Sequence, residues 1–486
     1  MTAASVPQAP AGPARLPLVG SIRLLRLELR RSIMLWLLPV IAALFWLITY
    51  RSAMSNPPMW NIRAMSMQTS ILAVFVPTIV GAAAWLGSRE ARHGLTDLLS
   101  GTARTRWVRQ LATWAATTCW ALVAYLGCVA VLYTVTARQA TWGGPLWWPV
   151  AVGAASLPAS AALGFVAGTA RPSRFTAPVV AVTAFLALEI TANFIHGDNS
   201  PWQVSPLVAG PWEIGPDQGV ATFYPYLRDL PIVQLMFLAG LSVALLAMLG
   251  LPAGSGSRRM RWFAAALTTG GVLATVAATA LAGTGRLDPH GMIAIPALHR
   301  ASSDRPVPYT PVCADTKIPV CLHPAYAVHL PTVVAALDSV LGELAGLPGA
   351  PVRIEQAAAS YQQESPNGVR IGRSGKVMSG NPPTLHLLLP MQGGRSMTVG
   401  ELSSALRTET AHDIVNSVIG GDRRDLSPAQ QAVLDAILKT STLRPGTPAA
   451  TAAQRLAALP PAARHAWLTQ HVAALRAGQI ALADLP

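Results

Sequence analysis

The chain has 486 residues, of which 52% are hydrophobic and only 12% are charged, and its mean hydropathy is +0.40. Soluble domains carry about 25% charged residues, so this composition excludes a wholly soluble protein and favours one embedded largely in a bilayer. The net charge of +14 does not indicate nucleic-acid binding, because most of the excess lies beside the apolar runs of residues 1–284. The preference for Arg over Lys, with abundant Ala, Gly and Pro, is typical of a GC-rich bacterial genome, so we expect a bacterial plasma-membrane protein.

Seven apolar runs are long enough, or nearly so, to cross about 30 Å of hydrocarbon. They lie at residues 33–50, 69–86, 111–135, 147–170, 177–195, 230–251 and 262–282. The fourth run is rich in small residues and contains Pro158, which spans tolerate when they pack against other helices. Residues 33–284 are therefore predicted to form a polytopic, mainly α membrane domain of about seven helices.

The segments between these runs differ in arginine content. With the N-terminus inside, the inner segments together hold fifteen arginines and the outer segments hold four. The inner segments are 1–32, 87–110, 171–176 and 252–261, and the outer ones are 51–68, 136–146 and 196–229. This bias predicts a cytoplasmic N-terminal segment, residues 1–32. An odd number of spans then places residues 285–486 outside the cytoplasm.

Two cysteines enclose a short loop, VCADTKIPVCLHP, at residues 312–324. Outside the cytoplasm, Cys313 and Cys321 face oxidising conditions that favour a disulfide, although free thiols remain an alternative. A metal site would need four ligands, and this spacing with one nearby histidine falls short, so we expect no metal. Cys119 and Cys128 lie within the third run and are interpreted as small packing residues.

Residues 16–32 are predicted to form an amphipathic helix before the first span. Its two faces carry Ile22, Leu25 and Leu29 on one side and Arg23, Arg26 and Arg30 on the other. Such a basic helix is suited to lie at the inner headgroup level, in contact with membrane lipid. A general juxtamembrane anchor that sets orientation explains the same residues equally well.

The second inner segment, SREARHGLTDLLSGTARTRW at residues 88–107, is much longer than a turn requires. It mixes acidic and basic residues and contains a short helical stretch from Leu95 to Leu99, flanked by Gly94 and Gly101. A compact helix held between two spans is a good contact for a cytoplasmic partner, because force on it passes to both spans. We therefore expect a partner to bind here.

On these residues the chain resembles the permeases of the type-two (exporter-like) ABC transporters. That family carries a Glu, then a Gly, an acidic-Leu-Leu helix and a turn ending in Arg before its third span. The corresponding residues here are Glu90, Gly94, Asp97, Leu98, Leu99, Thr102, Thr105 and Arg106, with Arg104 in the same turn. Leu95 stands where Thr is usual, Ala103 stands where Pro is usual, and a seventh span follows the family's six.

The resemblance implies that this segment is a coupling helix that docks on a separate ATPase subunit. It also implies a homo- or heterodimer of permease subunits, transport in the outward direction, and no catalytic residue or cofactor in this chain. The chain has no phosphate-binding loop, since the nearest match, GRSGKVMSG at residues 372–380, lacks the required first glycine and Ser/Thr. The ATPase is therefore expected on another chain.

Glu189 is the one charged residue within a predicted span, in the fifth apolar run. Acidic residues inside a membrane are functional hypotheses by default, here for substrate or proton binding. Its place near the outer interface also allows a structural role, in which the carboxylate reaches out to water.

Residues 285–486 are long enough for a domain with its own core, predicted as α+β and extracytoplasmic. A helix is expected at 329–347, with an apolar stripe of Val333, Leu337, Val340 and Leu341. Strands are expected at 352–355 and 385–389. Helices follow from residue 398 onward, with a break at Pro460–Pro461.

One segment of this domain, His412-Asp413-Ile-Val-Asn416, is similar to the zinc-protease pattern H-E-x-x-H. Asn416 replaces the second histidine, and Asp413 is shorter than Glu, so we do not expect an active hydrolase. The alternative to a permease is a membrane-anchored peptidase-like or sensor protein in which the spans serve as an anchor. A scaffold for a cell-envelope complex is a third hypothesis.

Overall fold

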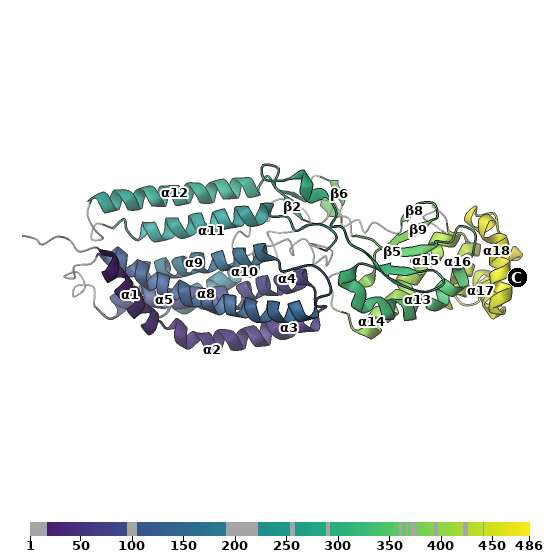
Figure 1. Ribbon diagram of the computed structural model, residues 1–486, viewed down its shortest axis with the longest axis horizontal. Coiled ribbons are helices and arrows are strands. Elements are labelled where there is room, and N and C mark those ends of the chain that lie inside the picture. The colour runs from purple at the N-terminus through teal and green to yellow at the C-terminus, as the bar shows by residue number, and fades with distance from the viewer. Residues whose placement is uncertain are drawn as a thin grey trace, which may run out of the picture.

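The computed structural model is mainly helical and elongated, with a bundle of long helices at one end and a smaller sheet-and-helix part at the other (Figure 1). The residues that it describes are 17–94, 105–190, 222–252, 258–287, 292–358, 362–365, 368–370, 377–392, 397–420, 426–440 and 442–486. The bundle helices run roughly along the long axis of the molecule (Figure 1).

Six of the seven predicted spans coincide with helices long and apolar enough to cross a membrane. The first joins α2 (Met34–Leu44), the π-helical segment η1 (Phe45–Tyr50) and α3 (Arg51–Ser55), and the second joins α4 (Trp60–Ser70), the π-helical segment η2 (Ile71–Phe75) and α5 (Val76–Gly87). The others are α8 (Arg106–Gln139), α9 (Trp147–Ala170), α11 (Asp229–Met248) and α12 (Arg258–Ala282). The chain is therefore built as a multi-pass membrane protein.

The fifth predicted span and the seventh membrane-length helix do not coincide. α10 (Thr176–Ile190) covers the start of the fifth run, and residues 191–195 of that run lie outside the described residues. The seventh helix of sufficient length and hydropathy is Pro324–Leu344, which contains α13 (Leu330–Leu344). It belongs to the C-terminal part, where the core and not lipid covers its apolar face.

The predicted start of the second span was wrong. The helix begins at Trp60 and not near residue 69, so most of the expected outer loop 51–68 is helical. Pro57 and Pro58 end the preceding helix, and no Pro or Gly interrupts the chain from there to Pro77. The correction places polar residues, including Asn61 and Arg63, on a buried helix rather than in a loop.

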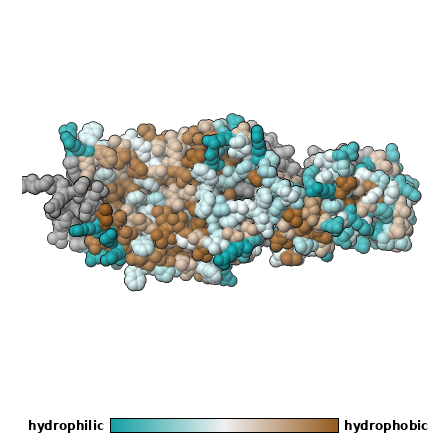
Figure 2. Space-filling model, viewed as in Figure 1, coloured by the Kyte–Doolittle hydropathy of each residue, from teal (hydrophilic) through white to brown (hydrophobic). Residues whose placement is uncertain are grey.

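The surface of the bundle is suited to lipid. Large apolar side chains are exposed along its helices, among them Trp36, Trp46, Val123, Val179 and Leu273. Figure 2 shows this brown apolar surface over the bundle, bordered by hydrophilic side chains towards both of its ends. An apolar band between two polar rims is the arrangement that a bilayer requires.

The C-terminal part is organised around a mixed five-stranded sheet. Its strand order is β3 (Val312–Ala314), β4 (Val320–Leu322), β5 (Arg353–Gln356), β9 (Thr384–Leu387) and β8 (Val377–Ser379). β4, β5 and β9 are parallel, while β3 and β8 pair antiparallel at the edges. Two further pairs, β1 (Arg286–Leu287) with β2 (Ile293–Ala294) and β6 (Gln362–Ser365) with β7 (Gly368–Arg370), lie apart from this sheet.

Helices complete this part of the chain. α13 links β4 to β5, and its predicted stripe is confirmed because Val333, Leu337, Val340 and Leu341 are all buried. The later helices are α14 (Val399–Ala405), the π-helical segment η8 (Leu406–Thr410), α15 (Ala411–Ile419), α16 (Pro428–Leu438), α17 (Pro448–Ala458) and α18 (Pro461–Arg476). The break predicted at Pro460–Pro461 is confirmed, since α17 and α18 end and begin there.

The two parts share a core. Met59 and Ile62, from the start of the second membrane helix, and Phe223 belong to the same buried apolar cluster as the sheet and α13. The C-terminal part is therefore packed onto the end of the bundle rather than tethered by a linker.

Candidate coupling site

The predicted amphipathic helix lies at the end of the bundle far from the C-terminal part (Figure 1). It forms α1 (Pro17–Arg31) and packs on α8, where the indole Nε1 of Trp120 donates a hydrogen bond of 2.9 Å to the carbonyl of Leu29. The basic face is exposed, and it comprises Arg23, Arg26 and Arg30. The apolar face is only partly covered, because Leu25 and Leu29 are half-buried but Ile22 is 56% exposed.

The segment after the second span begins with a short helix, α6 (Arg89–Arg92), which ion pairs tie to two neighbours. Arg89 Nη2 lies 3.1 Å from Glu28 Oε1 on α1. Glu90 lies 3.5 Å from Arg109 Nε and 3.8 Å from Arg106 Nε, both in the first turn of α8. Three segments that are distant in the sequence therefore meet at one end of the bundle.

The remaining residues of the predicted coupling helix are not all described. Gly94 follows α6 with φ +64°, a left-handed conformation that glycine adopts without strain. Asp97, Leu98, Leu99 and Arg104 lie outside the described residues, so the expected helix over 95–99 stays a prediction.

The ion pairs of this site position the segments rather than stabilise the fold strongly. Glu90 is 20% exposed and Arg106 is 41% exposed, and pairs of this kind contribute about 1 kcal/mol or less. They also fix the position of α6, because Glu90 contacts two arginines in the first turn of α8. A force on α6 would thus reach α8, α1 and the second span together.

Two other predicted residues lie elsewhere. Glu189 is in the last turn of α10, and its side chain is outside the described part of the structure. Cys313 and Cys321 face each other on β3 and β4 and are bonded, with an S–S distance of 2.11 Å. Arg353 of β5 points its Nε at Cys321 Sγ, 3.0 Å away, so the disulfide lies at the edge of the main sheet.

The residues similar to a zinc-protease pattern do not converge on a site. His412 and Asp413 lie on α15 with side chains 44% and 53% exposed, and their closest polar atoms are 4.0 Å apart. Within the described ranges, no group of three His, Cys, Asp or Glu side chains could hold a metal ion.

The junction between the bundle and the C-terminal part encloses a histidine. His323 is fully buried, and its ring contacts Tyr309, Phe223 and Trp142 at centroid distances of 4.2, 4.8 and 5.0 Å. Its Nδ1 accepts a hydrogen bond of 3.1 Å from the backbone N–H of Ala325. An aromatic box built from both parts of the chain thus surrounds one neutral imidazole.

This burial predicts a pH dependence of stability. Desolvation lowers the pKa of His323 to about 4, well below the ordinary histidine value. The unfolded chain therefore binds more protons than the folded one between about pH 6.5 and pH 4, so stability is full above pH 6.5 and falls as the pH drops through that window. The loss is about 3 kcal/mol.

Unfolding midpoints of the wild type and a His323→Phe variant between pH 8 and pH 4 would measure this loss. The stability difference between the two should shift against the wild type as the pH falls. A difference that stays constant with pH would contradict the assignment.

The pKa of a second histidine at the junction, His299, is shifted in the opposite direction, upward. His299 Nδ1 lies 3.1 Å from Asp229 Oδ2 and its Nε2 lies 3.0 Å from Asp304 Oδ1. Burial lowers the pKa of His299, but the two carboxylates raise it more, and the net shift is upward. Asp229, which begins α11, also accepts the backbone N–H of Ile295, so this cluster fixes the chain after the last membrane helix to the bundle.

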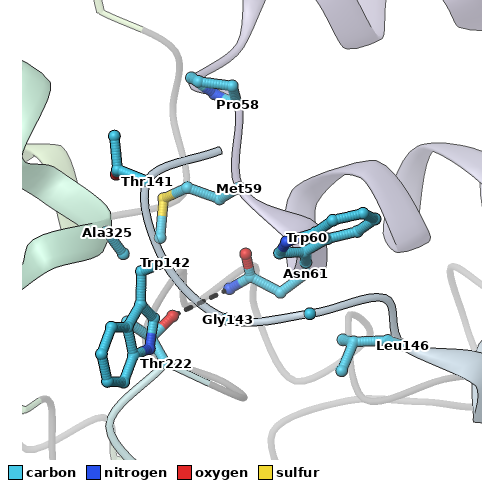
Figure 3. A pocket seen from close by; sticks show the side chains of 11 residues that line it. Pro58, Met59, Trp60, Asn61, Thr141, Trp142, Gly143, Leu146, Thr222 and Ala325 are labelled. Carbon is cyan, nitrogen blue, oxygen red and sulfur yellow. Dashed lines mark hydrogen bonds between the residues drawn. The ribbon is translucent and has the colours of Figure 1, made fainter. Parts of the chain in front are cut away.

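A small recess lies beside this junction (Figure 3). Asn61 on α4 donates a hydrogen bond of 3.4 Å to Thr222, and Trp60, Trp142 and Leu146 form the surrounding wall. Its volume of about 30 Å³ suffices for one or two water molecules and not for a substrate. In the described structure, the bundle and the C-terminal part therefore pack closely here and leave no substrate-sized opening.

Comparison of the chain with protein-family models, with curated proteins and with solved structures finds no match. The functional argument therefore rests on the chain's own residues.

Sequence reasoning missed the contacts of His323 and His299 at the junction, and it missed the burial of Arg63. The partners of His323 come from residues 142, 223 and 309, and no local pattern links positions so far apart. Arg63 was recoverable, since the stretch without Pro or Gly from residue 59 to residue 76 permits a longer helix.

Proposed function

We propose that this chain is the membrane-spanning permease subunit of an ABC transporter, and that a separate ATPase subunit drives it. The N-terminus and the α1–α6 end of the bundle would face the cytoplasm, and residues 285–486 would form an extracytoplasmic α+β domain. The chain itself would supply no catalytic residue. Export is the direction that the family resemblance favours.

The observation that carries the proposal is the meeting of α1, α6 and the first turn of α8 at one end of the bundle. The family resemblance assigns ATPase docking to the segment of α6, and the arginine bias assigns that end to the cytoplasm. The Glu28–Arg89 and Glu90–Arg109 contacts would let an ATPase that moves α6 tilt several membrane helices together.

The C-terminal domain would respond to the same movement. Because Ile62 of the second membrane helix and Met59 just before it lie in its core, a tilt of that helix would displace the domain. We infer that the domain guards or receives cargo where the pathway opens, since its position is fixed to the bundle and not flexible. A membrane-anchored hydrolase would need no such rigid connection.

Affinity isolation from mild-detergent extracts of the native membrane tests the proposal. The proposal predicts that an ATPase chain with a phosphate-binding loop is recovered at near-equal amount, together with a second permease chain. Recovery of the protein alone under conditions that preserve other ABC complexes would contradict it.

A further inference from the structure

The disulfide between Cys313 and Cys321 presents one cysteine to solvent and buries the other. The two residues lie directly opposite each other on β3 and β4, and β3 is an edge strand of the main sheet. Cys313 is exposed, whereas Cys321 is only 1% exposed. Exposed disulfides are commonly the labile, regulatory or catalytic ones, because an attacking thiolate can reach them. A thiolate that approaches from solvent therefore meets Cys313 first.

Arg353 of β5 lies against both sulfur atoms. Its Nε lies 3.0 Å from Cys321 Sγ, and its Nη2 lies 3.4 Å from Cys313 Sγ. A guanidinium beside a sulfur favours the thiolate over the thiol, and a stabilised thiolate leaves a disulfide faster. Glu355 Oε1 lies 2.9 Å from the same Nε, so this carboxylate holds the guanidinium in place and balances part of its charge. The buried sulfur is thus placed as the leaving group of an exchange reaction.

The same bond closes the segment that holds the bundle to the C-terminal part. Tyr309 lies shortly before β3 and His323 directly after β4, and their ring centroids are 4.2 Å apart in the aromatic box. The backbone N–H of Val307 donates a hydrogen bond of 2.8 Å to the carbonyl of Phe223, another residue of the box. Without the disulfide, β3 is held in the sheet only by three residues that pair with β4. Reduction would therefore loosen one wall of the junction.

We propose that Cys313–Cys321 is a thiol–disulfide exchange site for a dithiol reductant, and that the junction is fully held only while the bond is intact. A thiolate of the dithiol attacks Cys313 Sγ, the S–S bond breaks, and its electron pair passes to Cys321 Sγ beside Arg353. The second thiol of the reductant then attacks the reductant's own sulfur in the mixed disulfide and releases Cys313. The dithiol is oxidised to a disulfide, and its two protons end on the two cysteines. The inference does not depend on the proposed function.

The test follows the reduction of the full-length protein in detergent by dithiothreitol, with alkylation of Cys313 and Cys321 measured by peptide mass spectrometry. Arg353→Met should be reduced about tenfold or more slowly than the wild type, because the leaving thiolate loses a charge-assisted contact. Arg353→Lys keeps the charge and should recover part of the rate. Arg407→Met, which removes an exposed arginine from η8, should react like the wild type.

The direction of the effect separates this role from damage to the fold. A variant that merely loosens the sheet exposes Cys321 and reacts faster, whereas loss of the stabilising charge slows the reaction. Arg353→Gln, which keeps a polar side chain, should show the same slowing and replaces Arg353→Met if that variant does not fold. Equal or faster reduction of the variant without the charge would overturn the proposal.

Two measurements need no variant. Glutathione, a monothiol, should leave its adduct on Cys313 when the products are trapped rapidly by alkylation, and Cys321 should carry the alkyl group. Hydrogen exchange at the Val307 amide should become faster after reduction, because the segment before β3 is released. An adduct mainly on Cys321, or exchange at Val307 that does not change, would contradict the proposal.

Discussion

Replacing Gly168 by leucine is expected to prevent the membrane bundle from packing. A Cβ atom at Gly168 would lie 2.1 Å from the carbonyl oxygen of Ala84, and one at Gly164 would lie 2.2 Å from that of Val80. The two glycines are four residues apart on α9 and press against α5, a small-xxx-small contact in which backbones meet directly. The clash is with backbone rather than with a movable side chain, so α5 and α9 must separate.

The expected cost is about 3 kcal/mol or more, at the upper end of what overpacking causes. The yield of monodisperse protein in detergent and its thermal midpoint measure this cost. Gly127→Leu is the matched control, because Gly127 lies in α8 and a Cβ there meets nothing within 4 Å. Equal stability of the two variants would show that α5 and α9 do not pack as the structure describes.

Replacing Glu90 by lysine is expected to uncouple the protein from its proposed ATPase partner. The change places a third positive charge beside Arg106 and Arg109, where a carboxylate now lies 3.8 and 3.5 Å away. Like charges near 4 Å repel by about 1 kcal/mol in water and about 4 kcal/mol at a protein surface. α6 should therefore leave α8, and the co-isolated ATPase should fall about tenfold or more.

Two further variants separate coupling from general damage. Asp338→Lys makes the same charge reversal at an exposed position of α13 and should leave the complex intact. The charge swap of Glu90→Arg with Arg109→Glu should recover part of the association. Normal ATPase recovery with Glu90→Lys would remove α6 from the coupling path.

The membrane helices and the apolar stripe of α13 could be predicted because hydropathy and periodicity are local properties. Val333 and Leu337 lie one turn apart and are both buried, as the spacing alone indicates. The start of the second membrane helix could not be read from hydropathy, because Asn61 and Arg63 are polar and yet buried. The neighbouring Met59 and Ile62 pack into the core of the C-terminal part. Tertiary packing there overrides the local signal.

The candidate site was predictable only in its location. The family-like pattern pointed to Glu90 and Arg106, which do meet, but Arg109 and Glu28 join them through contacts that no spacing reveals. The aromatic box around His323 is equally non-local, since it draws on residues of both parts of the chain. Length and hydropathy also make α13 resemble a span, and only its contacts with the sheet distinguish it.

The account depends on α1 and α6 facing the cytoplasm while the C-terminal part lies across the membrane. Fusions of alkaline phosphatase and of green fluorescent protein after Pro486, compared with the same reporters placed before α1, test this directly. The account predicts phosphatase activity without fluorescence at the C-terminus and fluorescence at the N-terminus. Fluorescence after Pro486 without phosphatase activity would contradict it.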